Sequence, residues 1–325
     1  MKAVVCKELG PPDKLVVEEL PSLKAGKGQV VVSVKAAGVN FPDTLIIQGK
    51  YQFKPEPPFS PGGEVAGVIK EIGDGVVNVK LGDRVIASST WGGFAQEMVV
   101  DAERLIPMPD AMEFVAASAF VLTYGTSYHA LVDRGRLAPG ETLLVLGASG
   151  GVGLSAIQLG KALGARVIAA ASSDEKLKVC KENGADELIN YASEDLRARV
   201  KALADGRGVD VVYDPVGGVY SELALRDMAW NGRFLVVGFA AGEIPKIPLN
   251  LALLKGCSIV GVFWGAFTRN EPEHNRRNNA ELMRLYLTGK VKPHIHATYP
   301  LERAAEALNE VLNKRVSGKI VITTE

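Results

Sequence analysis

The chain contains little cysteine, and the few it has are far apart. Its three cysteines, Cys6, Cys180 and Cys257, are too scattered for a disulfide framework. No cysteine lies between Cys6 and Cys180, which leaves no group of four closely spaced thiols for a structural zinc ion. A chain without a disulfide pattern is typical of a reducing compartment, and we expect a cytoplasmic protein.

Long apolar runs and an excess of charge are also missing. The longest apolar stretches, such as 114–122, are too short and too interrupted to cross a bilayer. The chain begins MKAVVCKELG, which has neither the apolar core nor the cleavage site of a signal peptide. Lys+Arg and Asp+Glu number 37 each, so net charge gives no reason to expect a nucleic-acid or membrane partner. We expect a small-molecule substrate instead.

What remains is the composition of an ordinary globular protein. Hydrophobic residues make up 47% and charged residues 23% of the 325, which excludes wholesale disorder. A chain of this length exceeds what one hydrophobic core usually organises, so we predict two domains. Up to about residue 122 it is β-rich, with β-branched runs at 30–34, 65–72 and 84–87 between Gly, Pro and Asp turns.

Beyond residue 122, strand-like and helix-like segments alternate. Such alternation predicts parallel strands covered by helices, because a parallel crossover needs a helix-sized connection. Helices are expected at 152–163, about 174–183 and 301–312. The strands that we predict are 142–146, 166–171, 209–214, 234–237, 258–263 and 319–323.

The strongest local signal is a glycine-rich string between an apolar strand and a helical pattern. It reads GASGGVG from Gly147 to Gly153. Glycines let the backbone approach a pyrophosphate, and the helix N-terminus offers free N–H groups and a positive dipole end to the anion. Ala148 takes the first glycine position of the G-x-G-x-x-G pattern and is the next smallest residue. We predict a dinucleotide site here; a purely structural turn is the alternative.

The end of the second predicted strand indicates which dinucleotide binds. NAD sites usually have an acid there that accepts from the ribose 2′-OH. This chain reads Ala171-Ser172-Ser173, and Lys176 follows at helical spacing. We interpret the nearby Asp174 as the N-cap of the next helix. Hydroxyls with a lysine suit a 2′-phosphate, so NADPH is the predicted cofactor; the alternative is that Ser172 and Lys176 are plain surface residues.

Longer motifs place the chain in a family. They are AAGVNFPDTLIIQGKY, PFSPGGEVAGVI, LTYGTSYHAL, LGASGGVG and IPLNLALLKGCSIVGVFWG. With them the whole chain resembles the medium-chain dehydrogenase/reductase superfamily, in its zinc-free quinone oxidoreductase (zeta-crystallin-like) branch. The resemblance implies an α/β fold, with a Rossmann-type doubly wound parallel sheet and a β-rich GroES-like catalytic domain. We expect the GroES-like domain at 1–122 and 264–325, and the Rossmann domain at 123–263.

The resemblance also implies which residues would contact the cofactor. Where zinc-dependent relatives have a Cys and a His ligand, this chain has Asn40 and Gly63, so no metal site is expected. The predicted contacts are Ser149, Gly150, Gly151 and Val152 for the pyrophosphate, Ser172, Lys176 and Tyr191 for the 2′-phosphate, and Asn40, Thr126, Gly238, Phe239, Phe263 and Trp264 for the nicotinamide half.

Tyr51 and Asn40 are the predicted catalytic residues. Hydride addition to a conjugated carbonyl leaves negative charge on oxygen, and without a Lewis acid a proton donor must stabilise it. Tyr51 stands where similar zinc-free enoyl reductases have their proposed acid, and a phenol of pKa about 10 is protonated at neutral pH. Asn40 offers an amide donor. Alternatively, Tyr51 only packs on the nicotinamide or the substrate.

Three functions remain in competition. The leading one is an NADPH:quinone oxidoreductase-like enzyme that reduces quinones or related α,β-unsaturated carbonyls. The second is an enoyl-thioester reductase acting on acyl-CoA, with Tyr51 as proton donor. The third, of another class, is an NADPH-binding structural or nucleic-acid-binding protein without turnover. The family further implies a homodimer in which the strand at 258–263 pairs with its symmetry mate.

Overall fold

A computed structural model describes residues 1–324. The chain forms two compact units: unit 1 combines Met1–Leu122 with the residues from Pro293 onward, and unit 2 is Thr123–Lys292. Within the described range, no helix has both the length and the apolar character that a membrane crossing needs.

Unit 1 is built on a seven-stranded, mainly antiparallel sheet. Its order is β14-β15-β3-β4-β5-β7, with β6 also paired to β3, while β1 and β2 form a separate ribbon. Three helices accompany the strands: α1 (Phe41–Ile46), α2 (Phe114–Ala117) and α11 (Ala304–Leu312). The strands are β1 (Lys2–Val5), β2 (Val16–Glu19), β3 (Gln29–Val39), β4 (Glu64–Ile72), β5 (Arg84–Ser88), β6 (Glu97–Asp101), β7 (Ile106–Pro107), β14 (Ile295–Pro300) and β15 (Lys319–Thr323).

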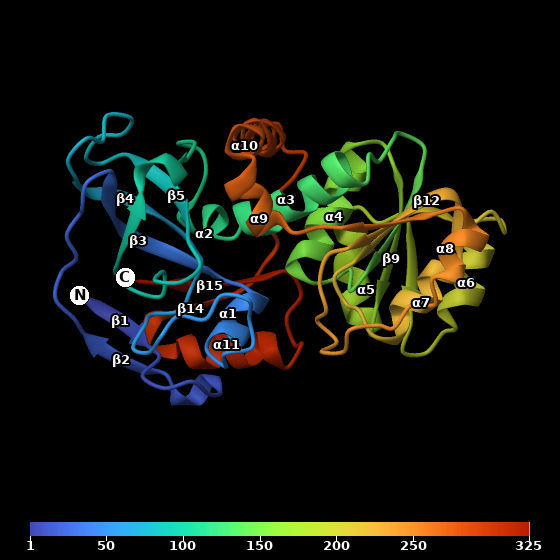
Figure 1. The fold of residues 1–325 in the computed structure, drawn as a ribbon, viewed down its shortest axis with the longest axis horizontal. Helices are drawn as coiled ribbons and strands as arrows, with labels where there is room; N and C mark the ends of the chain where they lie inside the picture. The colour runs from blue at the N-terminus through green and yellow to red at the C-terminus, as the bar shows by residue number, and fades with distance from the viewer. Residues whose placement is uncertain (325) are drawn as a thin grey trace. The chain divides into compact units, whose positions relative to one another are not determined.

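The C-terminal segment completes the sheet of unit 1. Strand β15, near the C-terminus, pairs antiparallel with β3, near the N-terminus, so that Ile320 lies opposite Val39 and Ile322 opposite Ala37 (Figure 1). All four residues are buried in the core of this unit. The apolar strand at the chain end is therefore held by burial against β3, and Ile320, Val321 and Ile322 are all buried, as its continuous apolar run indicates.

Unit 2 is a doubly wound sheet of six parallel strands in the order β10-β9-β8-β11-β12-β13. Because the chain winds outward from β8 in both directions, the order reverses between β8 and β11. The strands are β8 (Thr142–Leu146), β9 (Arg166–Ala171), β10 (Glu187–Asn190), β11 (Val209–Asp214), β12 (Met228–Val236) and β13 (Ser258–Gly261). Ligands bind at such reversals, beyond the carboxyl ends of the strands.

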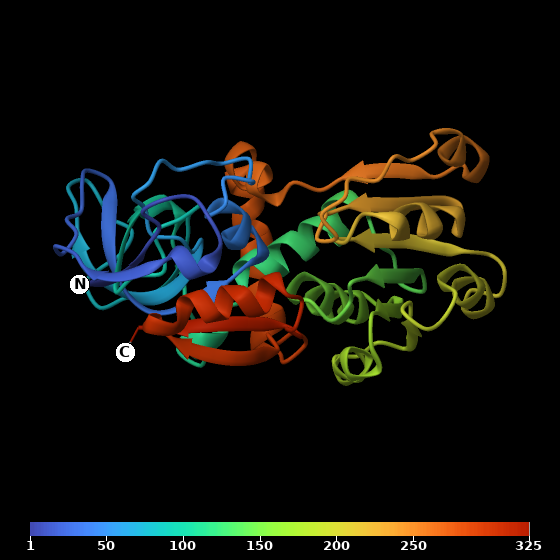
Figure 2. The ribbon, with the colours of Figure 1, turned by 90° about the horizontal axis from the view of Figure 1, so that it is seen from below.

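The helices α4 (Gly151–Ala162), α5 (Asp174–Glu182), α6 (Leu196–Leu203), α7 (Val219–Arg226) and α8 (Asn250–Lys255) pack against this sheet. The remaining helices are α3 (Val121–Tyr128), which starts at the end of unit 1, and α9 (Trp264–Asn270) and α10 (Pro272–Leu287), which pack against each other. A π-helix, His129–Arg134, continues α3. Figure 2 shows β13, in orange, at the border of the sheet.

The predicted fold class is confirmed, and so are most of the predicted elements. The strands at 142–146, 166–171, 209–214 and 319–323 have the predicted bounds. The strand predicted at 234–237 overlaps the end of the longer β12, which stops at Val236, and the one at 258–263 ends early, at Gly261. Strand β10 was not predicted, because its short ELIN sequence lacks a distinct apolar pattern.

The segment 264–292 differs from its predicted domain. It packs with unit 2, whereas the sequence interpretation had it in the GroES-like domain. The Phe267 ring of α9 stacks on His129 with ring centroids 3.9 Å apart. The Asn278 amide of α10 donates to Asp133 over 2.8 Å. Both partners lie in the π-helix that follows α3, and no sequence pattern of 264–292 itself predicts that pairing.

Candidate functional site

The glycine string forms a tight turn between β8 and α4. Gly147 has a φ of +56°, the left-handed region that favours glycine, and Gly150 is the N-cap of α4. A Cβ on Gly153 would lie 2.5 Å from the Gly147 carbonyl oxygen, so this glycine lets the helix approach the turn. The predicted pyrophosphate residues Ser149 to Val152 therefore surround the start of a twelve-residue helix.

The three predicted 2′-phosphate residues lie together at the end of β9. The Lys176 Nζ donates to the Ser172 Oγ over 3.2 Å. A further hydrogen bond joins the side chains of Ser172 and Tyr191, and burial raises the pKa of Tyr191 to about 12. An ammonium and two hydroxyls within one hydrogen-bonded cluster are chemically suited to a phosphate monoester.

Asp174 does not have the predicted capping role. Ser173 is the N-cap of α5, and its hydroxyl oxygen accepts from the Lys176 backbone N–H at 3.4 Å. Asp174 is the first residue of the helix, and its carboxylate accepts a hydrogen bond from the Asn190 amide at 2.8 Å. Serine and aspartate are comparable N-caps, so local sequence could not decide between adjacent positions.

Two of the predicted nicotinamide residues lie close to each other. The indole of Trp264, the first residue of α9, packs over Gly125, where a Cβ would come within 2.8 Å of its Nε1. Thr126, the other residue of this pair, directly follows Gly125 in α3. Phe263, the N-cap of α9, is 48% exposed. A glycine at position 125 is what lets the indole approach the helix.

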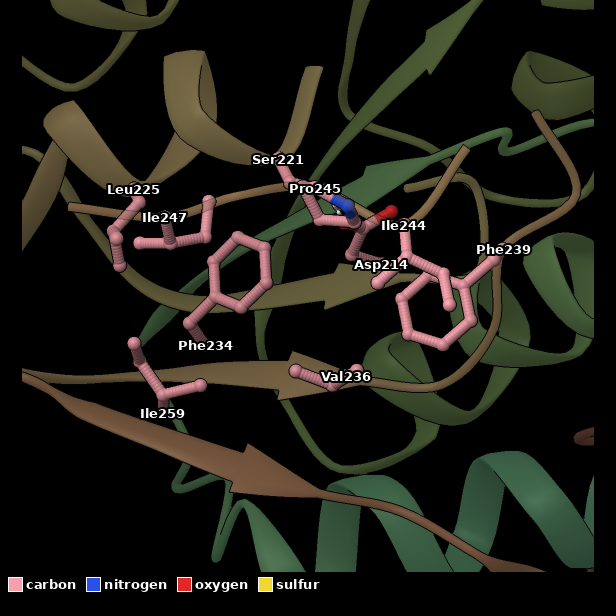
Figure 3. A pocket seen from close by; sticks show the side chains of 10 residues that line it. All are labelled: Asp214, Ser221, Leu225, Phe234, Val236, Phe239, Ile244, Pro245, Ile247 and Ile259. Atoms are coloured by element: carbon pink, nitrogen blue, oxygen red, sulfur yellow. Dashed lines mark hydrogen bonds between the residues drawn. The ribbon is translucent and has the colours of Figure 1, made fainter. Parts of the chain in front are cut away.

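The other predicted pair, Gly238 and Phe239, follows β12. The Gly238 N–H donates to the Asp214 carbonyl oxygen at 3.2 Å. Phe239 lines an apolar hollow together with Phe234 and Ile244, and Figure 3 shows Asp214 among these side chains. The Asp214 carboxylate accepts from the hydroxyl of Ser221 and from two backbone amides of the turn after β11. Sequence reasoning missed Asp214, although an acid at the end of a predicted apolar strand was a usable signal.

Asn40 lies in a buried polar network of unit 1. Its side-chain nitrogen donates to the Gly38 carbonyl and to the Glu64 carboxylate, both at 3.2 Å. Its side-chain oxygen accepts from Lys319 Nζ, which also donates to the Val39 carbonyl at 2.9 Å. Both amide hydrogens and the amide oxygen therefore have protein partners. This arrangement leaves Asn40 poorly suited to the donor role that the sequence interpretation gave it.

The charges of this network are deeply buried. Glu64 is 0% and Lys319 5% exposed, and their charged atoms are 3.7 Å apart. Asp43 joins the network through its carboxylate, which accepts from the Asn40 backbone N–H at 2.7 Å. Burial raises the pKa of Glu64 and that of Asp43, the latter to about 7, and it lowers the pKa of Lys319. Glu64 and Lys319 were not singled out from the sequence. The signal was a lone charge beginning each apolar strand, EVAGVI and KIVIT.

Tyr51 also belongs to unit 1. It is partly buried and packs against the hydrophobic core, and its ring centroid lies 6.0 Å from that of Phe53. Asn40 and Gly63 stand at the two positions where zinc-dependent relatives have their ligands. The Asn40 side chain is hydrogen-bonded within the buried network, and a Cβ added to Gly63 would lie 2.9 Å from the Ser89 carbonyl oxygen. Neither residue carries a thiolate or an imidazole.

Two family models match the chain. Residues 26–110 match the alcohol dehydrogenase GroES-like domain, and residues 151–279 match the model described as zinc-binding dehydrogenase. The first match lies within unit 1 and the second within unit 2, and the second runs past residue 263, where the sequence interpretation ended the dinucleotide-binding domain.

Similar proteins extend over the full length of the chain. It is 41% identical to the quinone oxidoreductase-like protein 2 homolog of Nematostella vectensis, over 100% of this chain and 89% of that protein. It is 34% identical to the quinone oxidoreductase of Homo sapiens, over 99% and 97% of the two chains. The crystal structure of Escherichia coli quinone oxidoreductase complexed with NADPH superimposes with a TM-score of 0.92 at 30% identity, covering 100% of both chains. The resemblance inferred from the motifs is thereby confirmed: the chain belongs to the zinc-free quinone oxidoreductase branch of the medium-chain dehydrogenase/reductase superfamily.

Proposed function

We propose that the protein is an NADPH-dependent oxidoreductase that reduces quinones or related α,β-unsaturated carbonyl compounds by hydride transfer, without a metal. The observation that carries the proposal is the Ser172, Lys176 and Tyr191 cluster at the end of β9. The cluster lies just beyond the end of β9, the strand next to β8, and the end of β8 leads into the glycine turn. The solved relative that was crystallised with NADPH supports the same cofactor.

The residues of unit 2 would hold the cofactor at two points. Backbone N–H groups at the start of α4 would face the pyrophosphate, where the absence of side chains at Gly150 and Gly151 permits close approach. The Lys176 ammonium and the Ser172 hydroxyl would receive the 2′-phosphate. When bound, the reduced nicotinamide supplies the hydride.

In this proposal Tyr51 stabilises the negative charge that the substrate oxygen gains on hydride transfer. Its phenol donates a hydrogen bond to that oxygen and is the candidate proton donor. Asn40 acts instead within the buried network, because its two amide hydrogens are donated to Gly38 and Glu64. The division of roles differs from the sequence interpretation, in which both side chains donated to the substrate.

We further propose that the protein acts as a homodimer through β13. This strand ends the sheet order of unit 2, and its Ile259 is 41% exposed. On nearby α8, Leu253 and Leu254 are 79% and 68% exposed. Pairing with a second copy would cover the strand edge and these leucines. Light scattering at micromolar concentration would measure twice the mass of 34.6 kDa, and a monomer would refute the dimer.

An acceptor screen tests the function. NADPH oxidation is followed with a set of quinones, enones and enals, with crotonyl-CoA as the thioester, and NADH replaces NADPH as the control. Faster oxidation of NADPH than of NADH with a quinone or enone supports the proposal. A kcat/KM that is orders of magnitude higher for the thioester would make the protein an enoyl-thioester reductase. Binding of NADPH with no oxidation by any acceptor would favour a protein without turnover.

A further inference from the structure

Two carboxylates lie directly beside the proposed 2′-phosphate cluster. Asp174 and Glu175 are the first residues of α5, and Asp174 is only two positions from Ser172. In NAD sites a carboxylate at the end of this strand accepts from the ribose 2′-OH, and a carboxylate close to the cluster would repel the 2′-phosphate of NADPH. In a site that prefers NADPH, these two carboxylates must therefore be held where they do not repel the 2′-phosphate.

Asn190 holds the nearer of the two carboxylates. Its side-chain nitrogen donates to the Asp174 Oδ1 at 2.8 Å. Asn190 is the last residue of β10 and lies in register with Ala171, the last residue of β9. The following residue, Tyr191, donates its backbone N–H to the Ala171 carbonyl at 3.1 Å and hydrogen-bonds Ser172 through its side chain. Of these two consecutive residues, Tyr191 thus contacts the phosphate cluster, and Asn190 contacts the neighbouring Asp174 carboxylate.

The amide of Asn190 is itself fixed in orientation. Its Oδ1 accepts from the Ala192 backbone N–H at 3.2 Å. Its own backbone N–H donates to the Glu194 carboxylate at 2.8 Å. Because the Asn190 Oδ1 accepts from the Ala192 N–H, the side-chain nitrogen of Asn190 is directed toward Asp174. Glu175 is restrained too, because its carboxylate is hydrogen-bonded to the hydroxyl of the Ser173 cap.

We propose that Asn190 is a positioning residue for cofactor selection: it ties the Asp174 carboxylate to the end of β10, so that this charge does not oppose a 2′-phosphate on Ser172 and Lys176. The inference rests on the proposed use of NADPH. Cofactor selectivity is the difference between the affinities for NADPH and for NADH. In this proposal, part of that difference comes from restraining the Asp174 carboxylate, whose charge would favour NADH.

Nucleotide affinities of a double-mutant cycle test this role. The variants are Asn190→Ala, Asp174→Asn and the double variant, and NADPH and NADH are titrated against each by nicotinamide fluorescence without an acceptor. In the wild-type background, Asn190→Ala releases the carboxylate, and we expect NADPH affinity to fall about five- to tenfold with NADH affinity unchanged or raised. In the Asp174→Asn background, the same substitution is expected to change the NADPH/NADH ratio less than twofold, since no charge is released.

A purely structural role of Asn190 would give other results. Equal losses of NADPH and NADH, or an equal change of the ratio in both backgrounds, would overturn the inference while leaving the proposed function intact. If Asn190→Ala does not fold, Asn190→Asp takes its place, because it keeps the acceptor for the Ala192 amide and removes the donor; an unchanged ratio in that variant would also overturn the inference. A wild-type protein that binds neither nucleotide would overturn the proposed function and this inference with it.

Discussion

Replacing Lys319 with methionine should destabilise unit 1 strongly. The ammonium of this residue donates to the Val39 carbonyl at 2.9 Å and to the Asn40 side chain, and it lies 3.7 Å from the Glu64 carboxylate. Lys319 is 5% and Glu64 0% exposed, so water cannot replace the lost partner. Methionine fills a similar volume without a charge, and the cavity contribution should therefore be small.

The magnitude follows from the burial of the charge that remains. Removing one partner of a buried pair costs about 3–5 kcal/mol, because the other charge stays desolvated without compensation. The lost hydrogen bonds alone would account for only about 1 kcal/mol each. For a domain of this size, a change of 1 kcal/mol shifts the melting temperature by about 2–4 °C, so we expect Lys319→Met to lower that of unit 1 by about 10 °C.

Calorimetry of three variants separates the charge from the packing. Combining Lys319→Met with Glu64→Gln removes both charges, and the double variant should regain more than half of the lost stability. Lys2→Met serves as the matched control, because Lys2 pairs with Glu302 on the surface, where both side chains are about half exposed. Its melting temperature should equal that of the wild type. A shift below about 2 °C for Lys319→Met, or a double variant as unstable as the single one, would refute the reasoning.

Three further predictions concern the cofactor and the proton. Tyr51→Phe should lower turnover of an enal about 100-fold with NADPH affinity unchanged; unchanged steady-state turnover would remove Tyr51 from the mechanism. Lys176→Met should weaken NADPH binding about tenfold or more in fluorescence titrations and leave NADH binding unchanged; equal losses would contradict a 2′-phosphate contact. Gly153→Ala should reduce the affinity for both nucleotides, since the added Cβ would lie 2.5 Å from the Gly147 oxygen; wild-type titration curves would refute this reading of the turn.

The parts of the candidate site that sequence predicted depend on local chemistry. The turn from Gly147 to Gly153 requires a glycine at a positive φ and another where the helix backbone approaches the turn closely. Both requirements concern a stretch of seven residues, so the local sequence reveals them. Ser172 and Lys176 are only four residues apart, one just before the Ser173 cap and the other in the first turn of α5, so local chain geometry brings their side chains together. The family motifs supplied the remaining assignments, whose roles in the cofactor site stay predictions.

The sequence could not show which distant residues would meet. Lys319 and Asn40 are 279 positions apart and come together only because β15 pairs with β3 in one particular register. That pairing supplies the partner of the Asn40 amide oxygen, while the amide hydrogens are donated to Gly38 of β3 and to Glu64, the first residue of β4.

By itself, then, the sequence determined the fold class, the glycine turn and the closeness of Ser172 to Lys176, because periodicity, glycine geometry and neighbouring positions in the chain act over a few residues. Only the tertiary structure decided which buried charges compensate one another, where residues 264–292 pack and which carboxylate accepts a hydrogen bond from the Asn190 amide. The physical reason is that strand register and side-chain burial depend on contacts between segments far apart in the chain, and a local pattern does not encode them.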